Sequence, residues 1–336
     1  MKYSIIIPHF NIPGLLERAV NSIPRRSDSE VIIVDDASSN ECLQKVRNIC
    51  NEYGTHAKLI ELSKNSGGGV ARNVGVENAN GEFIIFLDSD DFFNDCISQI
   101  LDDYASNEIY DVIFFKANSV DSETLCPSYR MDYLNQEIDK WFTNRIKFED
   151  RLRYFFGVPV CKIIRKKLID QYGIKFDATR IHNDTTFSYM LGYHAKKIFA
   201  DERAMYCATV RLNSVSKQKD SNSILTTIDI LGRAVLFFRR INKRYMEDTL
   251  CHNIYMLLRR KDQDSFQKAF SNLEKLGLSQ SEMKNMFSYQ MAKTSIKSTI
   301  WIILHSSILR VRFLSFFYGL FVAIPNNICK LLIKTI

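Results

Sequence analysis

The chain has 336 residues, of which 46% are hydrophobic and 25% charged, and its formal net charge is +7. This length allows one sizeable core with an appendage, or two domains, and the charged fraction is ordinary for a soluble protein. The eight cysteines form no C-x-x-C pair, which argues against a disulfide framework or a zinc site and favours a reducing compartment. The apolar run before Pro8 is too short for a signal-peptide core, so we predict no export.

The positive charge is concentrated at the C-terminus. From Met283 onward the basic residues have no acidic counterpart, so they account for the whole net charge and residues 1–282 are neutral overall. The apolar runs 296–309 and 313–325 are each too short to span a bilayer, and two arginines separate them. We expect both runs to lie as helices on an anionic membrane surface, and we expect no nucleic acid partner. The alternative is that they pack on the rest of the chain as ordinary core.

Segments typical of strands and helices alternate over the first 120 residues. The predicted strands are 3–8, 30–35, 57–62, 82–88 and 111–116. The predicted helices between them are 13–23, 42–53, 69–79 and 96–105. Near-continuous apolar strands alternating with helices indicate an α/β fold with a mostly parallel sheet and helices on both faces. Ligands bind beyond the carboxyl ends of such strands, where Asp35, Asp36 and the acidic run Asp88–Asp91 fall.

Beyond residue 120 the pattern changes. Residues 121–150 are polar and aromatic without a clear period, and we interpret them as a long active-site loop with some local structure. Residues 152–172 are expected to form a helix, a turn and a second helix. Further helices are predicted over 185–191, 224–240, 247–260, 264–276 and 279–292.

Three segments carry chemistry. The run Asp88-Ser89-Asp90-Asp91 follows a strand, and a divalent cation would relieve the repulsion of its carboxylates and bridge to a diphosphate. Asp35-Asp36 also ends a strand, where a carboxylate can accept from a uracil imide or a ribose hydroxyl. The run 64–73 has glycines that open a helix, a setting that suits a phosphate, and Arg72 lies one turn in. Helix capping by Asp and Ser is the alternative for both acidic segments.

In this order, segments 4–11, 34–38, 65–75 and 81–91 resemble glycosyltransferase family 2. The resemblance implies the GT-A fold and an inverting, hexosyltransferase-type enzyme that uses a nucleoside-diphosphate sugar, which we expect to be a UDP-sugar. It implies that Asp88 and Asp90 hold Mn²⁺ or Mg²⁺. The donor-binding residues expected on this basis are Pro8, Phe10, Asp35, Asp36, Asn65, Gly68, Arg72, Asp88, Arg211 and Ser214.

Three later segments extend the resemblance. The segment 160–166 is similar to the family's N-K-L-[FY]-[RK] motif, which implies that Lys162 lies on the acceptor side, although Cys161 replaces the usual Asn. Residues 182–187 match E-D-x-x-F with Asn183 in place of Glu, which implies an acceptor-side Asn183 and makes Asp184 the general base. An N-cap for the following helix is the alternative for Asp184. The segment 211–216 resembles R-x-x-S-x-S, in which Arg211 would offset charge on the leaving diphosphate.

The predicted organisation follows from these motifs. We expect a GT-A catalytic domain over 1–220, divided at residue 120 into a nucleotide-sugar side and an acceptor side, then a helical region over 221–292 and the membrane-associated segment 293–336. The expected acceptor is a glycan, lipid-linked, in bacterial surface polysaccharide synthesis at the cytoplasmic face of the inner or plasma membrane. A non-catalytic nucleotide-sugar-binding protein and a nucleotidyltransferase remain as alternatives.

Overall fold

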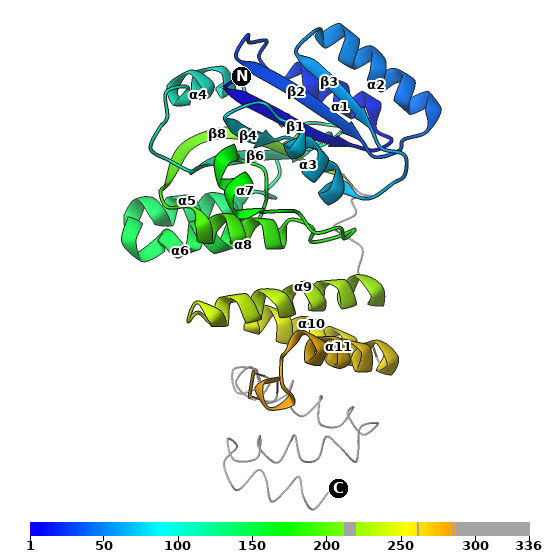
Figure 1. Cartoon of the computed structure of the whole chain (residues 1–336), viewed down its shortest axis with the longest axis vertical. Helices are drawn as coiled ribbons and strands as arrows, with labels where there is room; N and C mark the ends of the chain where they lie inside the picture. The colour runs from blue at the N-terminus through cyan, green and yellow to red at the C-terminus, as the bar shows by residue number, and fades with distance from the viewer. Residues whose placement is uncertain (212–219, 261, 284, 287–336) are drawn as a thin grey trace, which may run out of the picture. The chain divides into compact units, whose positions relative to one another are not determined.

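The computed structural model describes residues 1–211, 220–260, 262–283 and 285–286. The chain divides into two compact units, Met1–Lys217 and Gln218–Ile336 (Figure 1). The predicted C-terminal helices over 296–309 and 313–325, and the predicted donor residue Ser214, lie outside the described residues.

The first unit is built on one eight-stranded sheet in the order β3-β2-β1-β4-β7-β6-β8-β5. Its strands are β1 Tyr3–His9, β2 Ser29–Asp35, β3 Ala57–Glu61, β4 Phe83–Phe86, β5 Phe92–Phe93, β6 Val112–Asp121, β7 Lys162–Arg165 and β8 Ile198–Val210. β1, β2, β3 and β4 pair in parallel, whereas β7 runs antiparallel to β4 and β6, and β5 runs antiparallel to β8. The sheet is therefore parallel in its N-terminal half and mixed in the other.

The helices of this unit are α1 Pro13–Asn21, α2 Asn40–Tyr53, α3 Gly68–Glu77, α4 Ile97–Tyr104, α5 Asp132–Thr143, α6 Arg145–Phe155, α7 Lys166–Tyr172 and α8 Thr185–His194. The alternation predicted for the first 120 residues is confirmed, with boundaries that move by a few residues. β1, β2 and β4 are buried along nearly their whole length, which is why they are apolar without alternation.

Residues 121–172 differ from the prediction. Where a long loop was expected, α5 and α6 form, and Leu134, Ile138 and Trp141 on one face of α5 are buried in the core. The second part of the expected helix–turn–helix is the short strand β7 followed by α7. β7 has four residues, of which only Ile163 and Ile164 are apolar. A pattern this short does not distinguish a strand from a helix.

The second unit packs α9 Ser221–Arg240, α10 Glu247–Arg259 and α11 Gln263–Leu276 around their own core. Gly232 allows α9 and α11 to approach closely, because a Cβ there would lie 2.5 Å from Leu273 Cδ2. Within the described part of the chain, α9 has the length and hydropathy to cross a membrane, but 44% of that stretch is buried. Its residues Ile228 and Val235 belong to the core of this unit, as in a core helix of a soluble protein.

Candidate functional site

Parallel pairing brings the ends of β1, β2 and β4 to one edge of the sheet. His9 and Asp35 are register partners there, and His9 Nδ1 lies 2.8 Å from Asp35 Oδ2. Ser38 donates to Asp35 through its backbone N–H at 2.8 Å and its hydroxyl at 2.6 Å. Burial opposes the charge of Asp35, but the bonds from His9 and Ser38 outweigh it and lower the pKa of this carboxyl. Asp35 is fully buried, so any part it has in donor binding goes through His9 and Ser38.

Asp36 holds the entrance to α3. Its two carboxylate oxygens accept from the backbone N–H groups of Ser66 and Gly67, each at 2.7 Å. Gly67 caps α3 with φ of 89°, a conformation that favours glycine. Asp36 thus connects the end of β2 to the glycine segment. The nucleobase of a bound donor would have to share a carboxylate that already accepts two backbone hydrogen bonds.

The acidic turn, residues Asp88–Asp91, is held in place by hydrogen bonds to the carboxylate of Asp91. Tyr206 on β8 donates its hydroxyl to Asp91 Oδ2, and the Thr209 backbone N–H donates to Asp91 Oδ1 at 2.6 Å. Burial raises the pKa of Asp91 to about 7, and the negative charges of Asp90 and Asp88 add to this shift. Asp91 is therefore a support of the turn, facing away from solvent.

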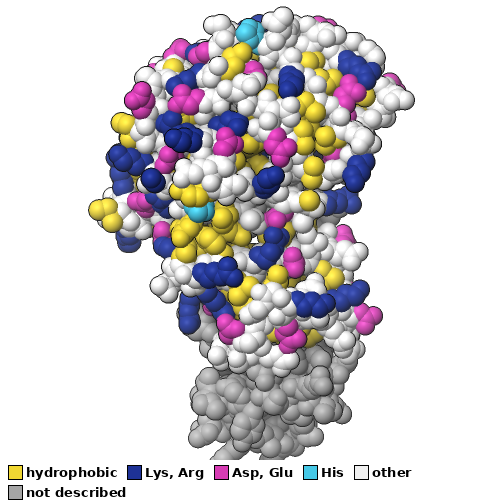
Figure 2. Space-filling view, in the orientation of Figure 1, with side chains coloured by type: hydrophobic (Ala, Val, Ile, Leu, Met, Phe, Trp, Pro, Cys, Tyr) yellow, Lys and Arg dark blue, Asp and Glu magenta, His cyan; other side chains and the backbone are white. Residues whose placement is uncertain are grey.

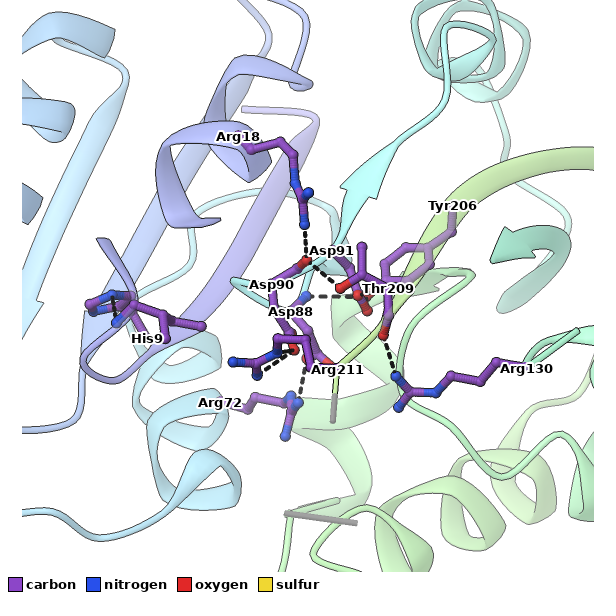
Figure 3. A network of polar contacts seen from close by, with 11 residues as sticks. His9, Arg18, Arg72, Asp88, Asp90, Asp91, Arg130, Tyr206, Thr209 and Arg211 are labelled. Carbon is purple, nitrogen blue, oxygen red and sulfur yellow. Dashed lines mark hydrogen bonds and ion pairs between the residues drawn. The ribbon is translucent and has the colours of Figure 1, made fainter. Parts of the chain in front are cut away.

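Arginines surround the other side of the turn (Figure 3). Arg211 donates to Asp90 Oδ2 from Nε at 3.0 Å and Nη2 at 2.6 Å. The Asp90 carbonyl accepts from Arg18 at 2.8 Å and from the Thr209 hydroxyl at 2.8 Å. Arg130, which precedes α5, donates to the Thr209 carbonyl at 2.7 Å. Arg18 and Arg211 therefore contact the acidic turn directly, and Arg130 contacts Thr209, which is itself bonded to the turn.

Arg72 connects the acidic turn to the segment expected to carry the base. Its Nη2 donates to Asp88 Oδ1, and its Nη1 donates to Asn183 Oδ1 at 3.2 Å. The side chain is 10% exposed and its guanidinium lies 5.5 Å from the Phe176 ring. Asn183, which stands where the family has Glu, thus accepts from the same guanidinium that pairs with Asp88.

Close packing at Gly69 brings the two segments together. A Cβ at this position would lie 2.3 Å from the Asp177 carbonyl oxygen and 2.8 Å from Asn183 Cβ. Asn73 adds a reciprocal pair with the Phe176 backbone, at 3.0 Å and 2.9 Å. The start of α3 therefore touches the segment that leads into Asp184, although more than 100 residues separate them in sequence.

Asp184 stands at the N-cap position of α8, but its side chain makes no capping hydrogen bond. Burial raises the pKa of the Asp184 carboxyl, while the positive charge of Arg72 opposes the shift. A carboxylate that is withheld from capping and partly desolvated has the properties of a general base. The capping alternative raised for this residue is not what the structure contains.

The acidic turn fits a divalent cation held jointly with a ligand. In the described part of the chain, no group of three His, Cys, Asp or Glu side chains could hold a metal ion. Arg72 engages one oxygen of Asp88 and Arg211 one oxygen of Asp90, which leaves a hard oxygen on each for another partner. Mg²⁺ commonly binds through one or two carboxylates together with substrate phosphates, so this donor set suits it.

Lys162 lies in a different place from the one expected. It is 1% exposed, and its Nζ donates to the carbonyls of Phe156 and Val158. Burial lowers the pKa of Lys162 to about 7. A side chain buried in this way is not available to touch an acceptor. Cys161 has φ of 61°, a left-handed conformation that Asn adopts more readily than most residues other than glycine.

Four further predicted donor residues in the described part of the chain lie at the end of β1 and between β3 and the start of α3. Pro8 is half-buried at the end of β1, and Phe10 is 45% exposed directly after it. Asn65 is exposed in the segment before α3, and Gly68 starts that helix, 3.3 Å from the Arg72 guanidinium when a Cβ is built on it. These four positions are compatible with the donor side, and their roles stay predictions.

Sequence reasoning missed the supports of the acidic turn. Tyr206 and Thr209 lie on β8, a strand that was not predicted, and Arg18 lies on α1. Asp91 was visible in the acidic run, but nothing in the run distinguished a buried support from an exposed ligand. The partners of these groups lie more than 70 residues away in sequence, so local patterns carry no signal of them.

A family model described as "Glycosyl transferase family 2" matches residues 4–173. The chain is 29% identical over 180 residues to the poly(ribitol-phosphate) beta-N-acetylglucosaminyltransferase TarP of Staphylococcus aureus (strain N315), covering 52% of each protein. It is 38% identical over 99 residues to the corresponding enzyme TarS of Staphylococcus aureus (strain Mu50 / ATCC 700699), covering 28% of this chain and 17% of TarS. The chain thus spans about half of TarP and a smaller part of TarS.

Solved structures share the fold. TarS residues 1–349 of S. aureus in complex with UDP-GlcNAc matches with a TM-score of 0.58 and 22% identity, covering 87% of this chain and 80% of that one. The mannosyltransferase PcManGT from Pyrobaculum calidifontis, in complex with GDP-Man and Mn²⁺, matches with a TM-score of 0.50 and 13% identity, covering 96% and 84%. At these identities the likeness concerns the fold, and it confirms the predicted GT-A architecture.

Proposed function

Because the chain belongs to glycosyltransferase family 2 and is a glycosyltransferase, we propose that it transfers a sugar from a UDP-sugar to a glycan hydroxyl with inversion. The observation that carries this proposal is the bridge made by Arg72 between Asp88 of the acidic turn and Asn183, the residue before Asp184. That bridge connects the acidic turn, where the diphosphate is proposed to bind, to the segment that carries Asp184. The Asp184 side chain makes no capping hydrogen bond, so it is proposed to act as the base.

The proposed reaction assigns one role to each side of the bridge. Asp184 takes the proton of the acceptor hydroxyl as the hydroxyl oxygen bonds to the anomeric carbon of the donor. The bond between that carbon and the phosphate oxygen breaks, and its electron pair leaves with the nucleoside diphosphate. Arg211, 35% exposed at the acidic turn, can exchange Asp90 for the diphosphate and stabilise its growing charge. Attack from the side opposite the leaving group inverts the anomeric centre.

Asp88 and Asp90 would hold the divalent cation, Mn²⁺ or Mg²⁺. When bound, the cation would neutralise charge on the diphosphate and improve it as a leaving group. The Mn²⁺ in the structure of PcManGT supports this part of the proposal, and the UDP-GlcNAc bound to TarS supports the uridine nucleotide.

The acceptor is proposed to be a glycan, lipid-linked, that serves as a precursor of a bacterial surface polysaccharide. The names of TarS and TarP, which act on poly(ribitol-phosphate), support an acceptor that is a surface polymer or its precursor. The run of basic residues without acids after Met283 supports attachment to the cytoplasmic face of an anionic membrane, where a lipid-linked acceptor would lie. Removing residues from Ser295 onward should release the protein from vesicles that contain anionic lipid. Equal binding of the full and shortened chains to those vesicles would refute the attachment.

A product assay tests the proposed reaction. The purified chain is incubated with a panel of UDP-, GDP- and dTDP-sugars, beginning with UDP-GlcNAc, and release of nucleoside diphosphate is measured with Mn²⁺, with Mg²⁺ and with excess EDTA. We expect UDP release from one UDP-sugar, dependent on the cation, and no pyrophosphate. Pyrophosphate as the product would restore the nucleotidyltransferase alternative, and binding without turnover under all conditions would restore the non-catalytic one. Full turnover in excess EDTA would remove the cation from the proposal.

A further inference from the structure

We propose that Lys162 is a positioning residue that holds α8, and with it the base Asp184, through a clamp on three consecutive backbone carbonyls. The inference rests on the proposed function, because it takes Asp184 to be the base. The clamp consists of Lys162, the carbonyls of residues 156–158, and Ser188.

The carbonyls come from the turn that follows α6. Lys162 Nζ donates to the carbonyl of Phe156 at 2.9 Å and also to that of Val158. The carbonyl between them, that of Gly157, accepts from the Ser188 hydroxyl at 2.8 Å. Lys162 on β7 and Ser188 on α8 therefore donate to three successive carbonyls of one turn. Without these two side chains the carbonyls would need water as a donor or would lack a hydrogen bond.

Ser188 transmits this order to Asp184. The two residues lie one helical turn apart in α8, and the Ser188 backbone N–H donates to the Asp184 carbonyl at 2.9 Å. Ser188 is bonded to Asp184 through its backbone and to the Gly157 carbonyl through its side chain. It therefore fixes the position of the first turn of α8 relative to residues 156–158. The first turn carries the base, so its placement sets where the carboxylate lies.

The far end of α8 is held separately. Arg153 on α6 donates to the carbonyls of Gly192 and Ala195 at 2.7 Å and 2.6 Å. At Gly192 a Cβ would lie 2.0 Å from the Arg153 carbonyl oxygen, so α6 and α8 touch there, as their neighbouring positions in Figure 1 suggest. With its C-terminus anchored in this way, α8 needs a second contact near Asp184 to be fixed in orientation, and the clamp supplies it.

The charge of Lys162 adds to the argument. It is almost completely buried, its Nζ donates to backbone carbonyls, and the rings of Phe114 and Phe156 lie 5.4 Å and 5.1 Å from Nζ. An ammonium buried among carbonyls and aromatic rings is costly, and an apolar side chain of similar length would avoid that cost. Its placement within electrostatic reach of Asp184 favours the ionised form of the base.

The experiment compares Lys162→Met with Ser188→Ala in the full chain. Both changes break the clamp, so both should lower kcat at least about tenfold while donor KM changes less than about twofold. Lys162→Met also removes the charge that favours ionised Asp184, so the acidic limb of its kcat/KM profile should move to higher pH. Ser188→Ala keeps that charge, and its limb should stay in place. A purely structural lysine would not produce this difference between the two profiles.

Hydrogen exchange separates failure of the clamp from failure of the base. The Ser188 amide, which donates to the Asp184 carbonyl, and the amides of the next turn of α8 should lose protection in both variants. Wild-type kcat in Ser188→Ala, or unchanged protection in Ser188→Ala, would overturn the clamp even if Lys162→Met did not fold. Full turnover by Asp184→Asn would overturn the proposed base, and loss of protection in the same set of experiments would still support the clamp.

Discussion

The contact between Gly69 and the segment before Asp184 predicts the effect of adding one methyl group. In Gly69→Ala the new Cβ would lie 2.3 Å from the Asp177 carbonyl oxygen and 2.8 Å from Asn183 Cβ. Both values are below the 3.0 Å that real Cβ contacts respect, and the first neighbour is backbone, which cannot rotate away. The start of α3 and the 177–183 segment must therefore separate by about 1 Å.

The magnitude follows from two opposing terms. Alanine in place of glycine within a helix stabilises by about 1 kcal/mol, and overpacking costs about 1–3 kcal/mol. We expect a net loss of roughly 0–2 kcal/mol in the free energy of unfolding, too small to unfold the protein. The displacement affects activity far more, because a misplacement of about 1 Å between reacting groups costs about 100-fold in rate.

The assay is kcat/KM for nucleoside diphosphate release, measured beside a denaturant unfolding curve. Gly14→Ala is the matched control, because Gly14 lies in α1 with nothing within 4 Å of an added Cβ. It should stabilise by up to about 1 kcal/mol and leave kcat/KM unchanged. Wild-type kcat/KM in Gly69→Ala would refute the claim that this contact joins donor edge and base.

Three further predictions concern the buried polar groups. Tyr206→Phe removes the hydroxyl that donates to Asp91, so it should raise the donor KM and lower the free energy of unfolding by about 1–3 kcal/mol. Tyr3→Phe is the control, because Tyr3 is equally buried and donates to the Leu101 carbonyl; it should lower the free energy of unfolding without a change in donor KM. Arg72→Lys cannot bridge Asp88 and Asn183 at once and should lower kcat/KM more than tenfold; retention of wild-type kcat/KM would contradict the role of the bridge. Burial lowers the pKa of Lys162 to about 7 in the folded protein, so above pH 7 the unfolded chain binds more protons than the folded one. The free energy of unfolding of the wild type should therefore rise between pH 7 and pH 9, by at most ~1.4 kcal/mol per pH unit. Unfolding curves of Lys162→Met should lack this part of the pH dependence.

The sequence predicted the donor half of the fold well because its strands are buried on both faces. β1, β2 and β4 read as unbroken apolar runs, and the carboxylates that follow them had to meet at one edge. β8 was missed because Asp201, Glu202 and Arg203 interrupt it near a register shift in its pairing with β6. A strand of that composition has no local period to detect.

Several predicted site residues contact or influence one another in the structure, and their roles stay predictions. Arg72 pairs with Asp88 and Arg211 pairs with Asp90, while the charges of Arg72 and Asp88 act on the pKa of Asp184. Asp35 and Lys162 look identical to exposed ligands in sequence, because burial depends on what packs over them from distant segments. Tyr206 and Thr209 are found only once β8 is placed beside the acidic turn.

Basic and acidic residues are equal in number over residues 1–282. Figure 2 shows Lys and Arg side chains interspersed with Asp and Glu over the face in view, in keeping with the absence of net charge over residues 1–282. Attraction of a diphosphate therefore depends on local groups such as Arg18, Arg72 and Arg211 at the acidic turn, and much less on a field of one sign.

Asp184→Asn gives the most direct test of the central claim that a donor edge and a base form one site. Donor affinity is measured by calorimetry with the UDP-sugar that turns over, and acceptor-dependent release of UDP is measured at saturating donor. We predict donor affinity within about twofold of wild type and a loss of at least about 100-fold in kcat. Turnover at the wild-type rate with donor affinity intact would show that the reaction does not use Asp184, and the account would fail.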